Sequence, residues 1–278
     1  MRTCSKSGLT AAASALVDIV APGSPVVELY GRNGSDVYDQ ITRGDGNEIR
    51  EILHGARTTS GSILELAAGS GRLTLPLARL GRRTVAFDNS ERMLEILRGR
   101  LSATDTERII TVHGDMADFD LGERFGLVVL GTTSLTLLSP EKRRSCLSHV
   151  SRHLDADGVF LVSVFAASDM LSDRATEVAI IPSTTGNDDV FVFTETLHAS
   201  DGYRDVSIIR FRRAEDGGAP TTTTFVSRVG LVSESDLRAE LNDAGLMVQR
   251  TVPVKTGADT ADHRRLVMLE CTRNGARL

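Results

Sequence analysis

Gly69 and Gly71 stand where a strand, a tight turn and a helix would together build a binding site. The apolar residues Ile63, Leu64 and Leu66 predict a buried strand, and the two glycines follow it in a run of small residues. Glycine has no Cβ, so a ligand can lie directly against the backbone, and the first amides of a following helix point unpaired into the same space. This stretch therefore predicts a site for a polar ligand.

A carboxylate follows at the end of the next predicted strand. Asp88 comes about 20 residues after Gly69, directly behind the apolar residues 84–87. At the carboxyl end of a neighbouring strand, a carboxylate can accept hydrogen bonds from both hydroxyls of a ribose. Because Asp88 precedes Asn89 and a serine, it could instead cap the following helix. Its combination with the glycine turn favours ribose binding, with Asn89 beside it.

Two ligand classes use this geometry, and the spacing separates them. In a dinucleotide fingerprint, G-x-G-x-x-G, Thr74 would occupy the third glycine position, which weakens the hypothesis of a nicotinamide cofactor. Taken instead as acidic-x-small-x-Gly-x-Gly, the run beginning at Glu65 resembles the first motif of class I S-adenosyl-L-methionine (SAM) dependent methyltransferases, with Ala67 where glycine is commoner. The resemblance implies that Glu65, Ala67, Gly69 and Gly71 form the cofactor loop.

Two further stretches resemble the same family. Tyr38 begins a Tyr-Asp pair like that of the segment that closes over the cofactor, which implies that Tyr38 binds the methionine carboxylate and that Arg43 adds positive charge. A Gly-Asp pair ends the strand predicted over residues 109–113, which implies that Asp115 lies near the adenine amino group and that Met116 packs on the ring. Each of these residues could instead have a purely structural role. Tyr38 would then pack within its segment and Arg43 would be a solvated surface charge. Asp115 would be a turn residue, and Met116 would fill a gap in the core.

The apolar run 125–130 is typical of a strand in a parallel sheet covered on both faces. The hydroxyl residues behind it resemble a loop of small-molecule methyltransferases, which implies that Thr132 faces the cofactor. An Asn-Pro-Pro-Tyr type of signature, associated with methylation of planar nitrogens in bases and amides, is absent here. Its absence argues against DNA, RNA or a glutamine side chain as the methyl acceptor. No residue is assigned a catalytic role, and His113 after the third strand is more simply structural.

The succession of strands and helices predicts an α/β fold. By resemblance to the family, it is a Rossmann-like, seven-stranded, mostly parallel sheet with helices on both faces. Four β-rich runs separated by turn signals predict an inserted antiparallel β-hairpin subdomain. The predicted division is a segment and lid over residues 1–46, a cofactor-binding domain over residues 47–165 and 231–278, and the inserted subdomain over residues 166–230.

Several local expectations accompany this division. Residues 21–46 are rich in Gly, Pro, Asn and Asp and are predicted to be loop and turn, apart from a short apolar stretch. The helix after the glycine turn is predicted to reach about Leu80, with Gly81 as its stop. Residues 155–158 predict a turn before the fifth strand. The run 190–193, Val-Phe-Val-Phe, places apolar side chains on both faces of its strand, so one face should be covered by the core or by a second subunit.

Composition excludes several classes of protein. The 278 residues are 41% hydrophobic and 25% charged, as in ordinary soluble globular chains. A net charge of −5 with scattered Lys and Arg predicts no nucleic-acid partner. Asp18 interrupts the apolar N-terminal stretch, and no run of about 18 apolar residues occurs, so neither a signal peptide nor a membrane span is expected. Cys4, Cys146 and Cys271 form no C-x-x-C pair, which argues against a metal site and fits the cytoplasm.

The resemblance implies an enzyme that uses SAM and releases S-adenosyl-L-homocysteine (SAH). Carboxylates at Asp36, Asp39 and Asp45 and the lack of a basic stripe favour a neutral or cationic acceptor, so we predict N-methylation of a small-molecule or peptide amine. The glycine motif and the β insertion also resemble methyltransferases of natural-product clusters, among them those that dimethylate the terminal amine of daptide-type ribosomal peptides. The alternatives are an O-methyltransferase, a non-catalytic SAM-binding module and a nicotinamide-dependent oxidoreductase. The insertion would cover the substrate or form a homodimer surface.

Overall fold

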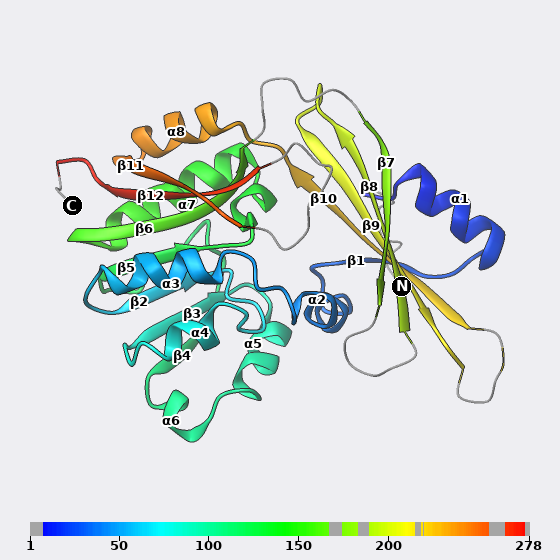
Figure 1. Cartoon of the computed structure of the whole chain (residues 1–278), viewed down its shortest axis with the longest axis horizontal. Helices are drawn as coiled ribbons and strands as arrows, with labels where there is room; N and C mark the ends of the chain where they lie inside the picture. The colour runs from blue at the N-terminus through cyan, green and yellow to red at the C-terminus, as the bar shows by residue number, and fades with distance from the viewer. Residues whose placement is uncertain are drawn as a thin grey trace. The chain divides into compact units, whose positions relative to one another are not determined.

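The computed structural model describes residues 8–166, 174–182, 189–214, 218, 220–255 and 265–275. The chain divides into two compact units (Figure 1). We call residues 45–170 and 232–278 the parallel-sheet unit, and residues 1–44 and 171–231 the antiparallel-sheet unit.

Seven strands form the sheet of the parallel-sheet unit, in the order β11-β12-β6-β5-β2-β3-β4. Neighbouring strands from β6 to β4 are parallel, whereas β12 is antiparallel to β6 and β11 is antiparallel to β12. This confirms the predicted α/β fold with a mostly parallel sheet. The strands are β2 (Ile63–Leu66), β3 (Thr84–Asp88), β4 (Ile109–His113), β5 (Phe125–Leu130), β6 (Leu154–Ala166), β11 (Leu246–Pro253) and β12 (Arg265–Arg273).

Helices cover both faces of this sheet. Cys146, Leu147 and Val150 of α7 and Leu237 and Leu241 of α8 pack on one face. On the other face, α3 and α4 pack over β2, β5 and β6, and α5 packs over β3. The helices are α3 (Ile49–Arg57), α4 (Thr74–Ala78), α5 (Glu91–Arg98), α6 (Ala103–Thr106), α7 (Pro140–His153) and α8 (Glu234–Asp243), with a 3-10 turn η1 (Ser134–Leu137).

Two of the three cysteines lie in this core. Cys146 and Cys271 are fully buried and free, and burial raises the pKa of each thiol to about 12. A thiol that stays protonated and buried is a packing group rather than a nucleophile. Cys4 lies outside the described residues.

The antiparallel-sheet unit joins the N-terminal segment to the inserted strands. Its sheet has the order β1-β10-β9-β8-β7, with β1 parallel to β10 and the other pairs antiparallel. The elements are α1 (Ala11–Val20), β1 (Val26–Glu28), α2 (Ser35–Thr42), β7 (Arg174–Pro182), β8 (Asp189–His198), β9 (Tyr203–Arg212) and β10 (Thr221–Gly230). The four predicted β-rich runs are all strands.

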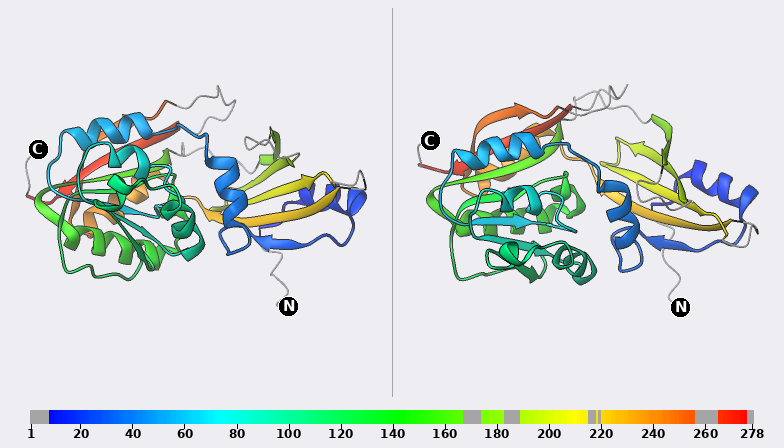
Figure 2. Two further views of the ribbon diagram at one scale, coloured as in Figure 1. Left: turned by 90° about the horizontal axis from the view of Figure 1, so that it is seen from below. Right: turned by 60° about the horizontal axis from the view of Figure 1, so that its bottom comes forward.

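One helix lies on each face of this five-stranded sheet (Figure 2). Phe191 and Phe193 of β8 face α2, whereas Val192 packs with α1. The apolar run on β8 is therefore covered, as predicted, and the cover comes from helices of the same unit. Val190 at the start of the strand is partly exposed.

The prediction of loop and turn over residues 21–46 is wrong for α2. Val37, Tyr38 and Ile41 have helical spacing and pack on the sheet, so tertiary packing stabilises a helix despite the surrounding turn-forming residues. The predicted turn at residues 155–158 is also wrong. These residues belong to β6, where a register shift opposite Phe125 accommodates them.

The helix after the glycine turn is shorter than predicted. α4 ends at Ala78, and the chain continues to Gly81 through bonds to carbonyls three residues back, from the amides of Arg79, Leu80 and Gly81. Gly81 has a φ of 70°, the left-handed conformation that ends many helices. Among the described residues, no helix combines the length and the apolar character needed to cross a membrane.

Candidate functional site

The loop between β2 and α4 alternates between ordinary and left-handed backbone. Ala67, Gly69 and Gly71 have φ angles of 54°, 56° and 95°. Glycine adopts this region without cost, whereas alanine pays a modest penalty. The predicted deviation at Ala67 is thus a tolerated strain at the first turn of the loop.

The two glycines meet different surroundings. A Cβ at Gly71 would lie 2.4 Å from Cδ1 of Leu97, so this glycine lets the loop approach α5. A Cβ at Gly69 would meet no atom within 4 Å. Gly69 therefore borders open space, which suits a residue whose bare backbone faces a ligand.

Gly71→Ala is expected to lower the free energy of unfolding by about 1 to 3 kcal/mol, because the new methyl group both clashes with Leu97 and strains a left-handed backbone. Urea denaturation measures the change. Gly122→Ala is the matched control, since Gly122 has a φ of 65° but no atom within 4 Å of its added Cβ. If both variants lose the same free energy of unfolding, the clash with Leu97 does not contribute to the effect of Gly71→Ala.

Asp88 ends β3 and joins the glycine loop to α5. One carboxylate oxygen accepts a hydrogen bond from the Gly69 amide at 2.7 Å, and the other accepts from the Ser90 amide at 2.8 Å. Burial raises the pKa of the Asp88 carboxyl above its usual range. The Asn89 amide is a third backbone donor to this carboxylate, so part of its capacity of about four lone-pair sites is left for a ligand. The N-cap residue of α5 is Ser90, so the alternative that Asp88 caps this helix is wrong. Ribose binding by Asp88 stays a prediction.

Glu65 lies under the loop, on the face of β2 covered by α3 and α4. It is buried, and the hydroxyl of Thr74 donates to its Oε2 at 2.6 Å. Burial raises the pKa of Glu65 to about 8, although the Thr74 hydroxyl and the Arg72 guanidinium act to lower it. Thr74 occupies the third fingerprint position and is itself fully buried by this contact.

The residues predicted to surround an adenine stand at the end of β4. Asp115 accepts a hydrogen bond from the Ala117 amide and pairs with Lys142 at 2.9 Å, and these contacts hold the pKa of its carboxyl below the usual range. Met116 packs partly buried against the main core. The Asn89 carbonyl contacts the ring of His113, so this histidine has a structural partner.

The loop after β5 is strained. Thr132 and Thr133 both have a φ of 55°, a conformation that β-branched residues seldom adopt. The Thr132 amide donates to Glu48 at 2.6 Å, and the Thr133 amide donates to the Ser163 hydroxyl at 3.2 Å. Such strain persists only where neighbouring groups enforce it, and it is concentrated at functional sites.

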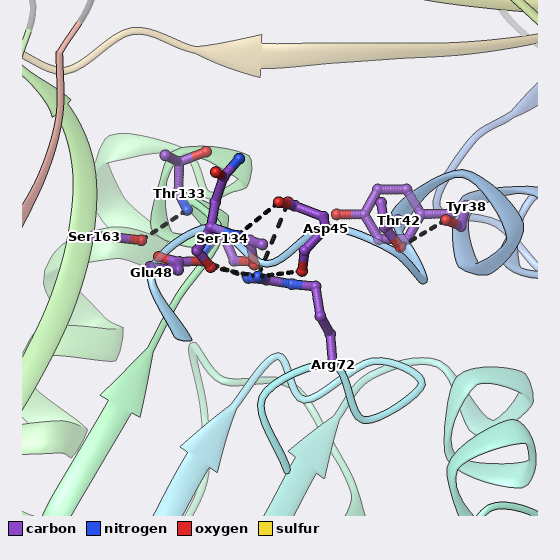
Figure 3. A network of polar contacts seen from close by, with 10 residues as sticks. Tyr38, Thr42, Asp45, Glu48, Arg72, Thr133, Ser134 and Ser163 are labelled. Carbon is purple, nitrogen blue, oxygen red and sulfur yellow. Dashed lines mark hydrogen bonds and ion pairs between the residues drawn. The ribbon is translucent and has the colours of Figure 1, made fainter. Parts of the chain in front are cut away.

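Glu48, Arg72 and Ser163 are further candidate site residues, which the sequence analysis did not single out. Arg72 follows Gly71, pairs with Glu48 and donates to the Asn47 carbonyl at 2.8 Å (Figure 3). Glu48 precedes α3, has a φ of 59° and is 1% exposed. A charged residue directly before a helix is ordinary in sequence, so no local pattern marked this pair.

The charges around the glycine loop favour a cationic ligand. Three carboxylates (Asp45, Glu48 and Asp88) lie around the loop with the guanidiniums of Arg72 and Arg100, which leaves an excess of one negative charge. Glu65, with its pKa raised to about 8, is mostly protonated at neutral pH and adds little to this charge. A pyrophosphate would meet net repulsion from these carboxylates, whereas a sulfonium or ammonium group would be attracted. Among the described residues, no group of three or more His, Cys, Asp or Glu could hold a metal ion.

The predicted cofactor residues fall in both units. Glu65, Ala67, Gly69, Gly71, Asp88, Asn89, Asp115, Met116 and Thr132 all lie in the parallel-sheet unit, at the carboxyl ends of β2, β3, β4 and β5. Tyr38 and Arg43 belong to the antiparallel-sheet unit, where the ring of Tyr38 makes a tilted contact with that of Tyr30 and Arg43 pairs with Asp39 at 2.7 Å. Their contact with a cofactor stays a prediction.

Residues 63–158 match a family model described as a methyltransferase domain. The dTDP-4-amino-2,3,4,6-tetradeoxy-D-glucose N,N-dimethyltransferase of Saccharopolyspora spinosa is 24% identical over 231 residues, which cover 80% of this chain and 88% of that protein. The cypemycin N-terminal methyltransferase of a Streptomyces species is 24% identical over 224 residues, 79% of this chain and 87% of the relative.

An uncharacterized methyltransferase of Staphylococcus carnosus is 28% identical over 135 residues, and that match spans 61% of the relative. Among solved structures, the glycopeptide N-methyltransferase MtfA complexed with SAM has a TM-score of 0.62 at 25% identity. The match covers 96% of this chain and 98% of that one.

Proposed function

We propose that this chain, a class I SAM-dependent methyltransferase, methylates an amine of a small molecule or peptide in natural-product biosynthesis. The observation that carries the proposal is the near full-length match to proteins whose names state N-methylation. They are the amino-sugar dimethyltransferase, the cypemycin N-terminal methyltransferase and the glycopeptide N-methyltransferase. These matches extend well beyond the methyltransferase domain at residues 63–158.

The cofactor site supports the same proposal. When bound, SAM supplies a methyl group on a sulfonium, and its positive charge suits the Asp45 and Glu48 carboxylates beside Arg72. Gly69 would let the cofactor approach the backbone, and Asp88 would hold the ribose hydroxyls. Asp115 and Met116 would border the adenine, and Tyr38 with Arg43 would bind the methionine carboxylate.

Holding the two reactants in place accounts for most of the rate enhancement that such a site needs. Methyl transfer to an amine is an in-line displacement, and alignment of the two reactants can contribute up to about 7 to 11 kcal/mol. The protein must also keep the amine neutral at the moment of attack. We assign no catalytic base. The inserted strands over residues 166–230 would cover the substrate or pair with a second copy of the chain.

Incubation with SAM and a panel of acceptors tests the proposal. The panel contains a dTDP-amino sugar, the corresponding hydroxy sugar and a short peptide with a free N-terminal amine. The peptide and the amino sugar are the expected acceptors, and mass spectrometry should show the gain of one or two methyl groups on nitrogen. Methylation confined to the hydroxy sugar would establish an O-methyltransferase. SAH binding without methylation of any acceptor would favour a non-catalytic module.

A further inference from the structure

Glu48 carries a buried carboxylate oxygen with no partner. Its Oε1 receives the Thr132 amide at 2.6 Å and the Arg72 guanidinium, whereas its Oε2 has no hydrogen-bond partner among the described residues. Because the side chain is 1% exposed, water cannot freely solvate this oxygen. An unsatisfied buried acceptor of this kind is costly, so a ligand donor is the natural explanation for its retention.

The neighbours of Glu48 hold this oxygen in place. Arg72 is anchored at the same time by the Asn47 carbonyl, and Thr132 is fixed in its left-handed conformation. A Cβ at Gly131 would lie 2.5 Å from Leu73 and 3.2 Å from Oε1 of Glu48, so glycine is needed for the loop to close around the carboxylate. The free oxygen is therefore a rigid acceptor rather than one position of a mobile side chain.

The local charge favours a cationic donor. Asp45 lies 3.9 Å from Arg72, and Glu48 pairs with the same guanidinium, so two carboxylates share one positive charge. A neutral donor would leave this excess uncompensated, whereas an ammonium group would offset it and donate along N–H. The unpartnered oxygen and the negative excess thus point to the same ligand chemistry.

The strand order places Glu48 at one end of the proposed cofactor site. β2 lies between β3, which carries Asp88, and β5, whose following loop contacts Glu48. With the ribose at Asp88 and the adenine toward β4, the methionyl end of SAM falls toward β5. Two cationic nitrogens would come together there in the proposed reaction, namely the α-ammonium of the cofactor and the substrate amine before it loses its proton.

We propose that Glu48 binds a protonated amine at the methyl-transfer site through its free Oε2. This assignment rests on the proposed function and adds a residue that no motif marks. The shared chemistry is a charge-assisted hydrogen bond from ammonium to a buried carboxylate, and the two sources are the cofactor α-ammonium and the substrate amine.

Calorimetric binding of SAH and of its analogue lacking the α-amino group distinguishes the sources. If the cofactor supplies the ammonium, the wild-type chain should prefer SAH by about 10- to 100-fold, and Glu48→Gln should lose that preference. Glutamine keeps an amide oxygen for Thr132 and Arg72 but places an NH₂ group where the free oxygen was. Glu51→Gln changes a buried glutamate of α3, the helix that Glu48 precedes, and this glutamate pairs with Arg50. It is the matched control and should keep the preference.

The second arm measures the KM for whichever amine of the acceptor panel the enzyme methylates. If the substrate supplies the ammonium, Glu48→Gln should keep the SAH preference and raise this KM by about 10-fold or more, whereas Glu51→Gln should not. Thermal unfolding checks that both variants fold. If Glu48→Gln keeps both the preference for SAH over its analogue and the KM for the amine, the role assigned to Glu48 is wrong, while the proposed function still stands. Failure of the wild-type chain to bind SAH would overturn the proposed function and this assignment together.

Discussion

Asp88→Ala should weaken the binding of SAM and SAH by about 10- to 100-fold, equivalent to about 1 to 3 kcal/mol. The carboxylate is buried at the end of β3 and would receive the ribose hydroxyls with its remaining lone pairs. Alanine removes that acceptor. It also frees the Gly69 amide from its 2.7 Å hydrogen bond, so the loop loses an anchor as well.

A variant that weakens α5, the helix after Asp88, and leaves the carboxylate in place separates a loss of ribose binding from a general loss of stability. Ser90 caps α5 by accepting a hydrogen bond from the Met93 amide at 3.4 Å. Ser90→Ala should lower the stability by about 1 kcal/mol and leave the affinity for SAH unchanged. Isothermal titration of both variants, with their unfolding curves, makes the comparison. A folded Asp88→Ala protein with wild-type affinity would refute the ribose assignment.

The parallel sheet could be predicted because its strands carry local signals. The apolar run 125–130 and the strand over 109–113 have the bounds of β5 and β4 as the structure has them. Strands buried on both faces are continuous apolar runs, and their ends are marked by Gly, Asp and Ser. The strand order came from the family resemblance, since no local pattern states which parallel strands are neighbours.

The antiparallel-sheet unit shows what local signals leave out. β1 pairs with β10 although about 200 residues separate them, and three residues of sequence cannot state such a partner. α2 forms within a stretch of turn-forming residues because the sheet supplies an apolar surface for Val37 and Ile41. Both findings depend on tertiary packing that overrides local propensity.

The site divides in the same way. Gly69, Gly71 and Asp88 could be predicted as candidate site residues from the sequence, because the backbone geometry of a strand, a tight turn and a helix calls for particular residue types at those positions. Glu48 and Arg72 were missed, since a buried ion pair between residues 24 positions apart leaves no periodic signal. Its significance becomes visible only when burial and the unpartnered oxygen are known.

The stability of the ligand-free protein should fall as the pH rises from about 4.5 to about 8, and Glu65 is the reason. Burial raises the pKa of this carboxyl from its ordinary value of 4.5 to about 8 in the folded chain. The folded state therefore binds one more proton than the unfolded state between these values. The contribution is complete below about pH 4.5 and is lost as the pH passes the folded pKa, with a slope of up to about 1.4 kcal/mol per pH unit.

Urea denaturation at a series of pH values between about 5 and 8 measures this slope. Glu65→Gln should flatten it, because the amide can still accept the Thr74 hydrogen bond but cannot ionise. The variant should also be more stable than the wild-type chain at the upper end of the range, by an amount on the order of a few kcal/mol. If the stability of the two proteins changes with pH in the same way, a group other than Glu65 takes up the proton on folding.

The same carboxyl should make the choice between SAM and SAH depend on pH. The two ligands differ by one methyl group and one positive charge. Both carry an α-ammonium, so the sulfonium is the charge by which an ionised Glu65 beneath the glycine loop distinguishes them. At separations typical of such a site, this attraction is about 1 to 2 kcal/mol, or about tenfold in affinity. The preference for SAM over SAH should therefore rise between about pH 6 and pH 9 in the wild-type chain and stay constant in Glu65→Gln. A pH-independent ratio in the wild-type chain would mean that the sulfonium binds beyond the reach of Glu65.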